Sequence, residues 1–242
     1  MLLDRKVILV TGTSRGIGKA TVLKCLAEGA TVVANYRSNI SFDDYSEAII
    51  SEKQLHFIKA DVRLATAVML MMEKIKDDFG QLDGIVNNAG VITRTSDWKN
   101  IEGSDWEYNL ETNVIGTWNV IRFGVDLMPK GGSIVNISSI YGSFPEANEL
   151  SYSVSKAGVN ALTIALAKKL SPNIRVNAVM PGNTLTSMVP DEEGVSAIEK
   201  KTLLQRSAQP CEIANTIAYL LSDQSSYITG SLYAADGGYH VL

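Results

Sequence analysis

Cysteine is scarce in this sequence of 242 residues, in which Cys25 and Cys211 are the only two. Two cysteines so far apart in the chain make neither a disulfide framework nor a zinc site, and we expect no bound metal. We therefore expect both to be buried free thiols in a reducing compartment.

Long apolar runs are also missing, since no stretch approaches the roughly 20 apolar residues that a membrane-spanning helix needs. The stretch MLLDRKVILVTG at the N-terminus places its charges before the apolar run 7–10, which is too short for a signal peptide. Charge of one sign is not in excess either, because the formal net charge is only -4. This balance favours neither nucleic acid nor an anionic membrane as a partner, and the expected location is the cytoplasm.

Short apolar runs rich in Val and Ile alternate along the chain with amphipathic stretches of helical spacing. Their continuous apolarity indicates burial on both faces, which is typical of a parallel sheet. The pattern predicts an α/β fold, a doubly wound parallel sheet of about seven strands with helices on both faces, in one domain spanning 1–242. The expected strands lie within 6–12, 30–36, 55–62, 82–90, 132–139, 174–182 and 231–236, and the expected helices within 18–29, 67–80, 151–170 and 212–223.

Two regions, 93–106 and 183–208, interrupt this alternation and are expected to be loops. Ligands of open α/β sheets bind outside the carboxyl ends of the strands, where such long connections gather. We therefore expect these two loops to form the substrate cleft.

The first expected strand is followed by TGTSRGIGKA, with Gly12, Gly16 and Gly18 opening directly into a helix. Glycines let the backbone approach a pyrophosphate closely, and a helix N-terminus offers it unpaired N–H groups. A structural turn is the alternative, but the strand–turn–helix context favours nucleotide binding.

The end of the second expected strand reads NYRS, so that Tyr36 stands where an acidic residue would hold the ribose 2′-hydroxyl of NAD. Arg37 follows it, and Arg15 lies in the glycine loop. Two guanidinium groups suit a 2′-phosphate, which indicates NADP rather than NAD. The alternative is that both arginines are solvated surface charges.

The stretch YSVSK places Tyr152 and Lys156 one helical turn apart, a spacing that alone also occurs by chance. It is accompanied by NNAG at 87–90, ISS at 137–139, PGNTLT at 181–186 and a closing ITG and DGG. Together with the glycine loop, these motifs resemble the short-chain dehydrogenase/reductase family over nearly the whole chain. Among its subgroups the sequence is most similar to the 3-oxoacyl-carrier-protein reductases.

The resemblance implies a Rossmann-like sheet, a catalytic tetrad of Asn113, Ser139, Tyr152 and Lys156, and a homo-oligomer, a tetramer or dimer built partly through the helix that carries Tyr152. It also implies NADP(H) as cofactor. Together, the glycine loop, the NYRS stretch and the resemblance give the expected cofactor-binding residues as Gly12, Ser14, Arg15, Gly16, Ile17, Gly18, Tyr36, Arg37, Asp61, Val62, Asn87, Ala89, Gly90, Tyr152, Lys156, Pro181, Gly182, Thr184 and Thr186.

Reduction of a ketone needs a hydride and a proton, and a tyrosine with a pKa near 10 is a poorly matched acid–base catalyst at neutral pH. We expect the charge of Lys156 to lower the pKa of Tyr152. By resemblance, Lys156 would also hold the nicotinamide ribose, Ser139 would hydrogen-bond the substrate oxygen, and Asn113 would hold a water that links Lys156 to solvent. The predicted function is an NADP-dependent ketone reductase or alcohol dehydrogenase acting on a small-molecule substrate. A non-catalytic dinucleotide-binding sensor or scaffold and an NAD-dependent alcohol or sugar dehydrogenase are the alternatives.

Three departures from the family pattern bear on the substrate. The crossover 38–54 is short, so its helix is expected to be short or distorted. Pro172 stands where a carrier-protein reductase would have a basic docking residue. Glu146 and Glu149 would repel an anionic substrate if they face the cleft, and the alternative is that they lie on a solvated loop.

Overall fold

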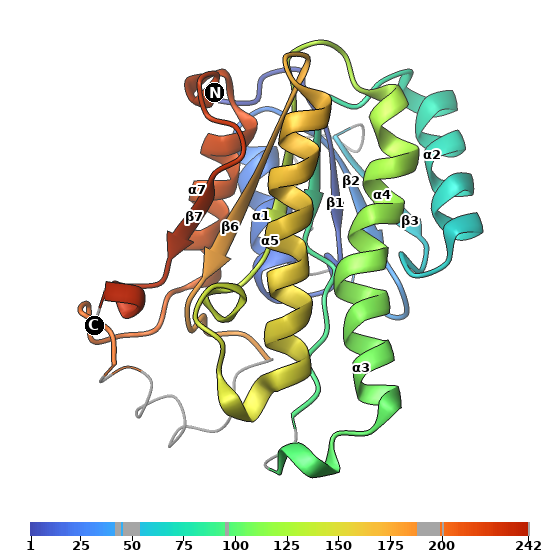
Figure 1. Ribbon diagram of the computed structural model, residues 1–242. Coiled ribbons are helices and arrows are strands. Elements are labelled where there is room, and N and C mark those ends of the chain that lie inside the picture. The colour runs from blue at the N-terminus through green and yellow to red at the C-terminus, as the bar shows by residue number, and fades with distance from the viewer. Residues whose placement is uncertain (42–44, 46–53, 95–96, 188–198, 200, 242) are drawn as a thin grey trace.

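The computed structural model describes residues 1–41, 45, 54–94, 97–187, 199 and 201–241 (Figure 1). These residues form one seven-stranded sheet in the order β3-β2-β1-β4-β5-β6-β7, and every neighbouring pair is parallel. The predicted parallel α/β fold is therefore confirmed. The strands are β1 (Val7–Thr11), β2 (Thr31–Tyr36), β3 (Leu55–Lys59), β4 (Gly84–Asn87), β5 (Gly132–Ile137), β6 (Ile174–Pro181) and β7 (Leu232–Ala235).

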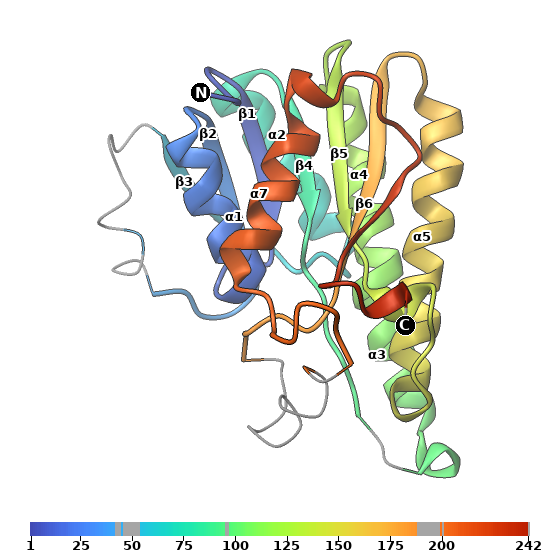
Figure 2. The ribbon, with the colours of Figure 1, turned by 90° about the vertical axis from the view of Figure 1, so that its left-hand side faces the viewer.

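Helices cover both faces of the sheet, as Figures 1 and 2 show. One face carries α1 (Gly16–Ala27) and α7 (Pro210–Leu221), which pack side by side. The other carries α2 (Ala65–Phe79), α4 (Gly116–Gly124) and α5 (Leu150–Leu170), with α3 (Gly103–Leu110) continuing below them in Figure 1.

The two cores explain why the strands read as unbroken apolar runs. In β1, Ile8 and Val10 pack toward α1 and α7, whereas Leu9 packs toward the opposite helices. All three side chains are fully buried. Burial of such a side chain contributes roughly 1.5–3 kcal/mol, so every position of a central strand favours an apolar residue.

The strand order reverses direction at β1, because the chain proceeds outward to β2 and β3 on one side and to β4 on the other. The loops after β1 and β4 therefore leave the sheet toward opposite faces. A crevice forms at such a switch point, outside the carboxyl ends of the strands. This topology positions the functional site.

Three expectations differ from the structure or lie outside it. The loop expected at 93–106 is interrupted by α3, which begins at Gly103 because the side chain of Glu102 and that of Asp105 form a reciprocal capping box. Cys25 is buried as expected, but Cys211 is exposed in the first turn of α7. Most of the crossover 38–54 and much of 183–208 lie outside the described residues.

Among the helices that the structure describes, none combines the length and the apolar character needed to cross a membrane.

Candidate active site

A cavity of about 780 Å³ opens at the carboxyl ends of the central strands. Its wall comes from the segments that follow β1, β2, β3, β4, β5 and β6, from Tyr108 and Thr112, and from the first turns of α5. Most of the residues expected to bind the cofactor line it, namely Gly12, Ser14, Arg15, Gly16, Ile17, Gly18, Arg37, Asp61, Val62, Ala89, Gly90, Tyr152, Lys156, Pro181, Gly182, Thr184 and Thr186. The topology thus brings together segments that are up to about three quarters of the chain apart.

The glycine loop passes so close to the neighbouring backbone that side chains are excluded. A Cβ atom on Gly12 would lie 2.7 Å from the Cα of Ala89, and Gly12 has a φ of +68°. A Cβ atom on Gly18 would lie 2.3 Å from the carbonyl oxygen of Gly12. Within the described residues, no side chain caps the N-terminus of α1, which begins at Gly16 beside the cavity. Its N–H groups remain available to an anion.

The two asparagines of the NNAG motif have opposite roles. Asn88 lines the cavity, and its amide donates to the carbonyl oxygens of Thr11 and Gly12, both at 2.9 Å. Asn87 instead lies behind the wall, where it is buried and donates to Oδ1 of Asn136 at 2.9 Å. The structure therefore does not bring Asn87 to the cavity, because successive side chains of a strand point to opposite sides.

The charged end of the cavity is formed by the residues after β2 and β3. Arg15 and Arg37 both line it, and Arg37 donates to the Tyr108 hydroxyl at 3.3 Å. Asp61 is held by the guanidinium of Arg63, and these hydrogen bonds, only partly opposed by burial, lower the pKa of the Asp61 carboxyl. Tyr36, expected in this group, is not part of the wall.

Three of the four expected catalytic residues meet at the opposite end. Ser139, Tyr152 and Lys156 line the cavity, and Ser139 lies close enough to the Tyr152 hydroxyl to lower its pKa. The ammonium of Lys156 donates to the carbonyl oxygen of Ile137 at 2.8 Å and lies 5.6 Å from the centroid of the Tyr152 ring. One turn of α5 therefore presents an acid and a cation to the same space.

The pKa of Tyr152 is shifted opposite to the expectation. Burial raises it to about 12, and the hydrogen bond with Ser139 offsets this only in part. Burial also lowers the pKa of Lys156 to about 8. Lys156 is not among the groups that shift the pKa of Tyr152, although its ammonium lies 5.6 Å from the centroid of the ring.

Asn113, the fourth expected catalytic residue, lies just behind the wall on η3 (Glu111–Ile115), a π-helical turn between α3 and α4. Its Oδ1 accepts from the backbone N–H of Val91 at 2.9 Å, and its amide donates to the carbonyl of Val91 and to the hydroxyl of Ser155. A Cβ atom on Gly90 would lie 3.2 Å from this Oδ1 and 3.5 Å from Nζ of Lys156. Asn113 thus joins the loop after β4 to α5 beside Lys156.

Among the wall residues that sequence reasoning did not single out are Asn88, Arg94, Thr112 and Tyr141. Asn88 and Thr112 each adjoin a residue that the motifs did mark, and Tyr141 lies two residues after Ser139. Arg94 forms an ion pair with Glu149, Nε to Oε1, at 2.9 Å. Glu149 therefore faces the cleft, but with its charge balanced.

Comparison with known proteins identifies the family. A family model described as enoyl-(acyl carrier protein) reductase matches residues 12–240. The 3-oxoacyl-[acyl-carrier-protein] reductase FabG of Thermotoga maritima is 37% identical over 247 residues, covering 98% of this chain and 99% of that protein. The chain belongs to the short-chain dehydrogenase/reductase family.

Two solved structures of similar fold were obtained with a bound dinucleotide. A short chain dehydrogenase from Burkholderia cenocepacia J2315, in complex with NADP, is 30% identical with a TM-score of 0.92, covering 99% of this chain and 100% of that chain. A blue fluorescent protein from a metagenomic library, in complex with NADPH, is also 30% identical with a TM-score of 0.92, covering 99% of each chain. Both support the Rossmann-like description of the sheet as a short-chain dehydrogenase/reductase fold.

The wall of this short-chain dehydrogenase/reductase fits the dinucleotide expected from the sequence. The glycine loop leaves room that any Cβ atom would fill. Thr112 lines the same cavity, and its hydroxyl is enclosed and has no hydrogen-bond partner within the described chain. An unpaired buried hydroxyl is costly, so a ligand that pairs with it is favoured.

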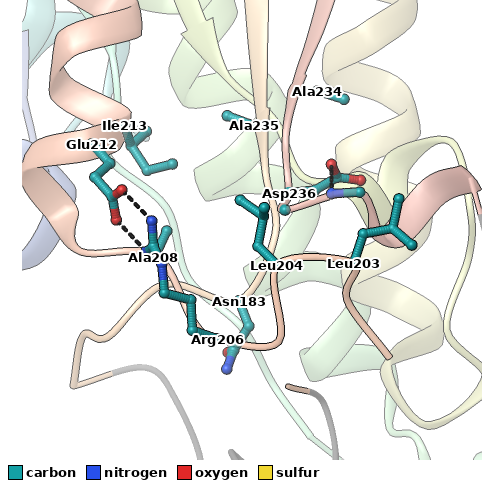
Figure 3. A pocket seen from close by; sticks show the side chains of 12 residues that line it. Asn183, Leu203, Leu204, Arg206, Ala208, Glu212, Ile213, Ala234, Ala235 and Asp236 are labelled. Atoms are coloured by element: carbon teal, nitrogen blue, oxygen red, sulfur yellow. Dashed lines mark hydrogen bonds and ion pairs between the residues drawn. The ribbon is translucent and has the colours of Figure 1, made fainter. Parts of the chain in front are cut away.

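A smaller cavity of about 450 Å³ lies between α7 and the end of β7 (Figure 3). The guanidinium of Arg206 donates two hydrogen bonds of 2.7 Å to Glu212, as Figure 3 shows. Asp236 accepts from the backbone N–H of Gly238 and His240 and pairs with the His240 ring at 2.7 Å. The charged groups of this smaller cavity are thus paired with one another. The hydrogen bonds of Asp236 hold the C-terminal segment in place.

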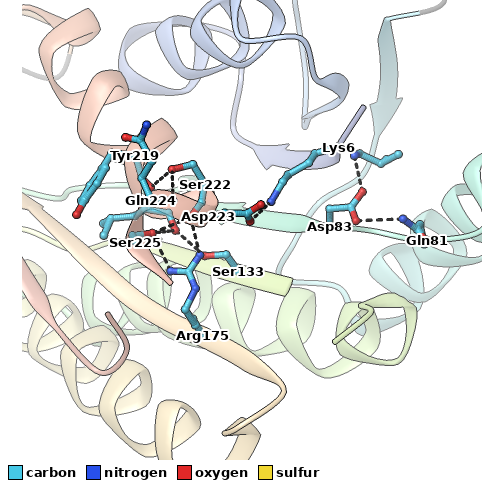
Figure 4. Close-up of polar contacts among 12 residues, drawn as sticks. Lys6, Gln81, Asp83, Ser133, Arg175, Tyr219, Ser222, Asp223, Gln224 and Ser225 are labelled. Carbon is cyan, nitrogen blue, oxygen red and sulfur yellow. Dashed lines mark hydrogen bonds and ion pairs between the residues drawn. The ribbon is translucent and has the colours of Figure 1, made fainter. Parts of the chain in front are cut away.

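A polar cluster at the amino ends of the strands is structural (Figure 4). Arg175 donates to the carbonyl of Ser222 and to the hydroxyl of Ser225, beyond the end of α7. Lys6 pairs with Asp223 at 2.6 Å. These contacts satisfy the C-terminal end of a helix with cations, at the edge of the sheet opposite the active site.

Proposed function

We propose that the protein is an NADP(H)-dependent oxidoreductase that interconverts a ketone and a secondary alcohol. The observation that carries this proposal is the meeting of Ser139, Tyr152 and Lys156 in the cavity that also contains the glycine loop. A proton donor, a hydroxyl that supports it and a cation thus share one enclosed space with a dinucleotide cradle.

NADPH, when bound, supplies the hydride. Arg15 and Arg37 would hold its 2′-phosphate, the N-terminus of α1 its pyrophosphate, and Lys156 its nicotinamide ribose. Support comes from the two guanidinium groups at one end of the cavity and from the NADP and NADPH bound to the two solved relatives.

The proton comes from a residue of the chain. In reduction, the carbonyl carbon gains the hydride, the electron pair of the C=O bond moves to oxygen, and that oxygen takes the proton of the Tyr152 hydroxyl. The raised pKa keeps Tyr152 protonated at neutral pH, so the proton is present for transfer, but it also makes the phenol a weaker acid than an unperturbed tyrosine. The Ser139 hydroxyl, which lines the cavity beside Tyr152, is placed to donate to the same oxygen as negative charge develops there.

Small carbonyl compounds suit this chain better than substrates on a carrier protein. The relatives from Thermotoga maritima and Synechocystis are named for acyl-carrier substrates. In this chain, however, the exposed turn between α5 and β6 has Pro172 at the position where a carrier-protein reductase would have a basic docking residue. Without that positive charge, the surface of this chain attracts an acidic carrier protein less strongly.

We also propose a homo-oligomer that covers α4 and α5. The described surface exposes apolar side chains on these helices and the preceding turn: Ile115 (46%), Trp118 (38%), Val154 (44%) and Ile164 (38%). Apolar side chains gathered on neighbouring helices are typical of a subunit interface.

The proposal is tested by following NADPH oxidation by the purified protein with a panel of ketones, hydroxyketones, diketones and oxoacyl thioesters, and by repeating it with NADH. We expect NADPH to be oxidised with at least one carbonyl compound and the matching alcohol to form in equal amount. A protein that binds NADPH but oxidises it with none of them would instead be a dinucleotide-binding sensor or scaffold.

A further inference from the structure

An ion pair crosses the substrate end of the cavity beside the catalytic tyrosine. Arg94 comes from the loop after β4, and Glu149 is the residue immediately before α5. Nε of Arg94 donates to Oε1 of Glu149 at 2.9 Å, and both side chains line the cavity. Glu149 is the more enclosed, with 14% of its side chain exposed against 42% for Arg94.

Buried polar side chains hold this pair in place from behind. The amide of Asn109, which is fully buried, donates to the hydroxyl of Thr93 at 2.5 Å and to that of Ser151 at 3.1 Å. Thr93 adjoins Arg94, and Ser151 lies two residues after Glu149. The two backbones that carry the charges are therefore tied together through α3, so the pair has a defined position relative to Tyr152.

Both charges act on the reacting group. Glu149 raises the pKa of Tyr152 and Arg94 lowers it, which places the pair within electrostatic reach of the phenol. Because the two charges balance, the pair attracts neither an anionic nor a cationic substrate strongly. It selects by hydrogen bonding instead.

Each partner retains unused hydrogen-bonding capacity. Across the described residues, the terminal NH2 groups of Arg94 and the second carboxylate oxygen of Glu149 make no hydrogen bond. A hydroxyl group is at once a donor and an acceptor, so it can donate to Glu149 and accept from Arg94. An alkyl group in the same place would remove water from both charges and replace none of their hydrogen bonds.

We propose that the Arg94–Glu149 pair is the specificity determinant of the site, and that it selects uncharged carbonyl compounds with a hydroxyl group on the carbon next to the carbonyl. This inference rests on the proposed function and names its substrate class. Glu149 precedes α5 directly and Tyr152 lies in its first turn, and both line the cavity, so a substrate whose carbonyl meets Tyr152 has its neighbouring carbon on the side of the pair.

The test compares NADPH-dependent reduction of three probes that differ at one group. Hydroxyacetone carries the hydroxyl, butan-2-one has a methyl group in place of the hydroxyl, and pyruvate has a carboxylate in place of the whole hydroxymethyl group. We expect the wild type to reduce hydroxyacetone with a kcat/KM roughly 10- to 100-fold above that of butan-2-one, the range for a hydrogen bond to a charged group. Pyruvate should be a poor substrate.

Two substitutions separate a selecting role from a merely structural one. In Glu149→Gln the hydroxyacetone preference should fall by about 10-fold, and the pyruvate-to-butan-2-one ratio should rise because Arg94 is no longer neutralised. Any effect of the lost charge on Tyr152 changes the kcat/KM values of all three probes by the same factor, so it cancels in their ratios. Glu146→Gln removes the same charge from the same segment but outside the cavity wall, and both ratios should stay at their wild-type values.

The outcomes are distinguishable. If butan-2-one is reduced as well as hydroxyacetone, or pyruvate better than either, the inference is overturned while the proposed reductase function stands. If Glu149→Gln and Glu146→Gln change the ratios equally, the pair does not select the substrate. If no carbonyl compound of the panel oxidises NADPH, the proposed function fails and the inference with it. Thermal melts of both variants within a few degrees of the wild type confirm that the pair contributes little to stability.

Discussion

The ammonium of Lys156 donates to the backbone carbonyl of Ile137 at 2.8 Å, at the carboxyl end of β5. This hydrogen bond anchors a fully enclosed charge to the sheet rather than to an acidic partner. Burial dominates the result, because it lowers the pKa of Lys156 to about 8. The protein therefore retains a cation that is costly to fold.

This cost can be measured as stability. A pKa lowered from 10.5 to about 8 corresponds to about 3 kcal/mol of lost folding stability. The variant Lys156→Met would recover part of this free energy. It would also leave the Ile137 carbonyl unpaired, which costs about 1–3 kcal/mol. We expect Lys156→Met to be at least as stable as the wild type at pH 7 in urea unfolding, with turnover lost. A variant clearly less stable than the wild type would show that the charge is not penalised.

The pH dependence has a definite sign. Below pH 8 the ammonium is protonated in both folded and unfolded states, and the penalty is fully present. Between about pH 8 and 10.5 the folded protein has released this proton while the unfolded chain still holds it, so the wild type gains stability relative to Lys156→Met as the pH rises. A stability difference that stays constant across this window would contradict the assignment.

Tyr152→Phe removes the proposed acid and keeps the ring. We expect the turnover number to fall by at least about 100-fold, the lower end of what general acid catalysis contributes, while NADPH affinity stays within a few-fold. Steady-state kinetics and fluorescence titration with NADPH measure the two effects. Tyr227→Phe, on a fully exposed tyrosine, is the matched control, and a Tyr152→Phe variant with retained turnover would remove Tyr152 from the mechanism.

Thr112→Val tests whether the unpaired hydroxyl belongs to the cofactor site. Because this hydroxyl is buried without a partner in the described chain, its removal should leave the ligand-free protein as stable or more so, and weaken NADPH binding by about 5- to 10-fold. Calorimetric titration measures the affinity. Thr112→Ser keeps the hydroxyl and should bind as the wild type does, and equal affinity of Val and Ser variants would show that the ligand does not use it.

Arg37, directly after β2, is the residue of this segment that we expect to set cofactor choice. We expect the wild type to favour NADPH over NADH by roughly 10- to 150-fold, the range for one guanidinium–phosphate contact, and Arg37→Ala to remove most of this preference. The measurement is the ratio of the two kcat/KM values at moderate salt. Arg5→Ala, on a side chain that is 93% exposed and distant in the fold, should leave the ratio unchanged.

The sequence predicted the sheet well because each central strand is buried on both faces, so its apolar runs have few alternatives. It also predicted which motifs line the cavity, since these lie at the ends of those strands. Which of two neighbouring asparagines faces the cavity was not predictable from the motif, and Asn87 was expected where Asn88 lies. That choice depends on the pleat at the end of β4, which composition does not determine.

Electrostatic partners were harder to predict than positions. Arg94 and Glu149 are distant in sequence, and only the packing of the loop after β4 against α5 brings them together. The same holds for Tyr152, whose pKa follows from the burial and the charges that surround it in the folded chain. Such quantities depend on three-dimensional surroundings, so a motif that names the right residue can still mislead about its protonation.

The π-helical turn at Glu111–Ile115 lets one helix continue from α3 into α4 although it holds one residue more than an α-helical turn. Each residue of an α-helix turns the chain by about 100°, so the same extra residue in a regular helix would rotate α3 against α4. The wider turn takes up that residue, and Asn113 lies within it, beside Lys156. Deleting one residue here would therefore close the turn to a regular α-helical one, which keeps the two helices aligned but removes the bulge that carries Asn113.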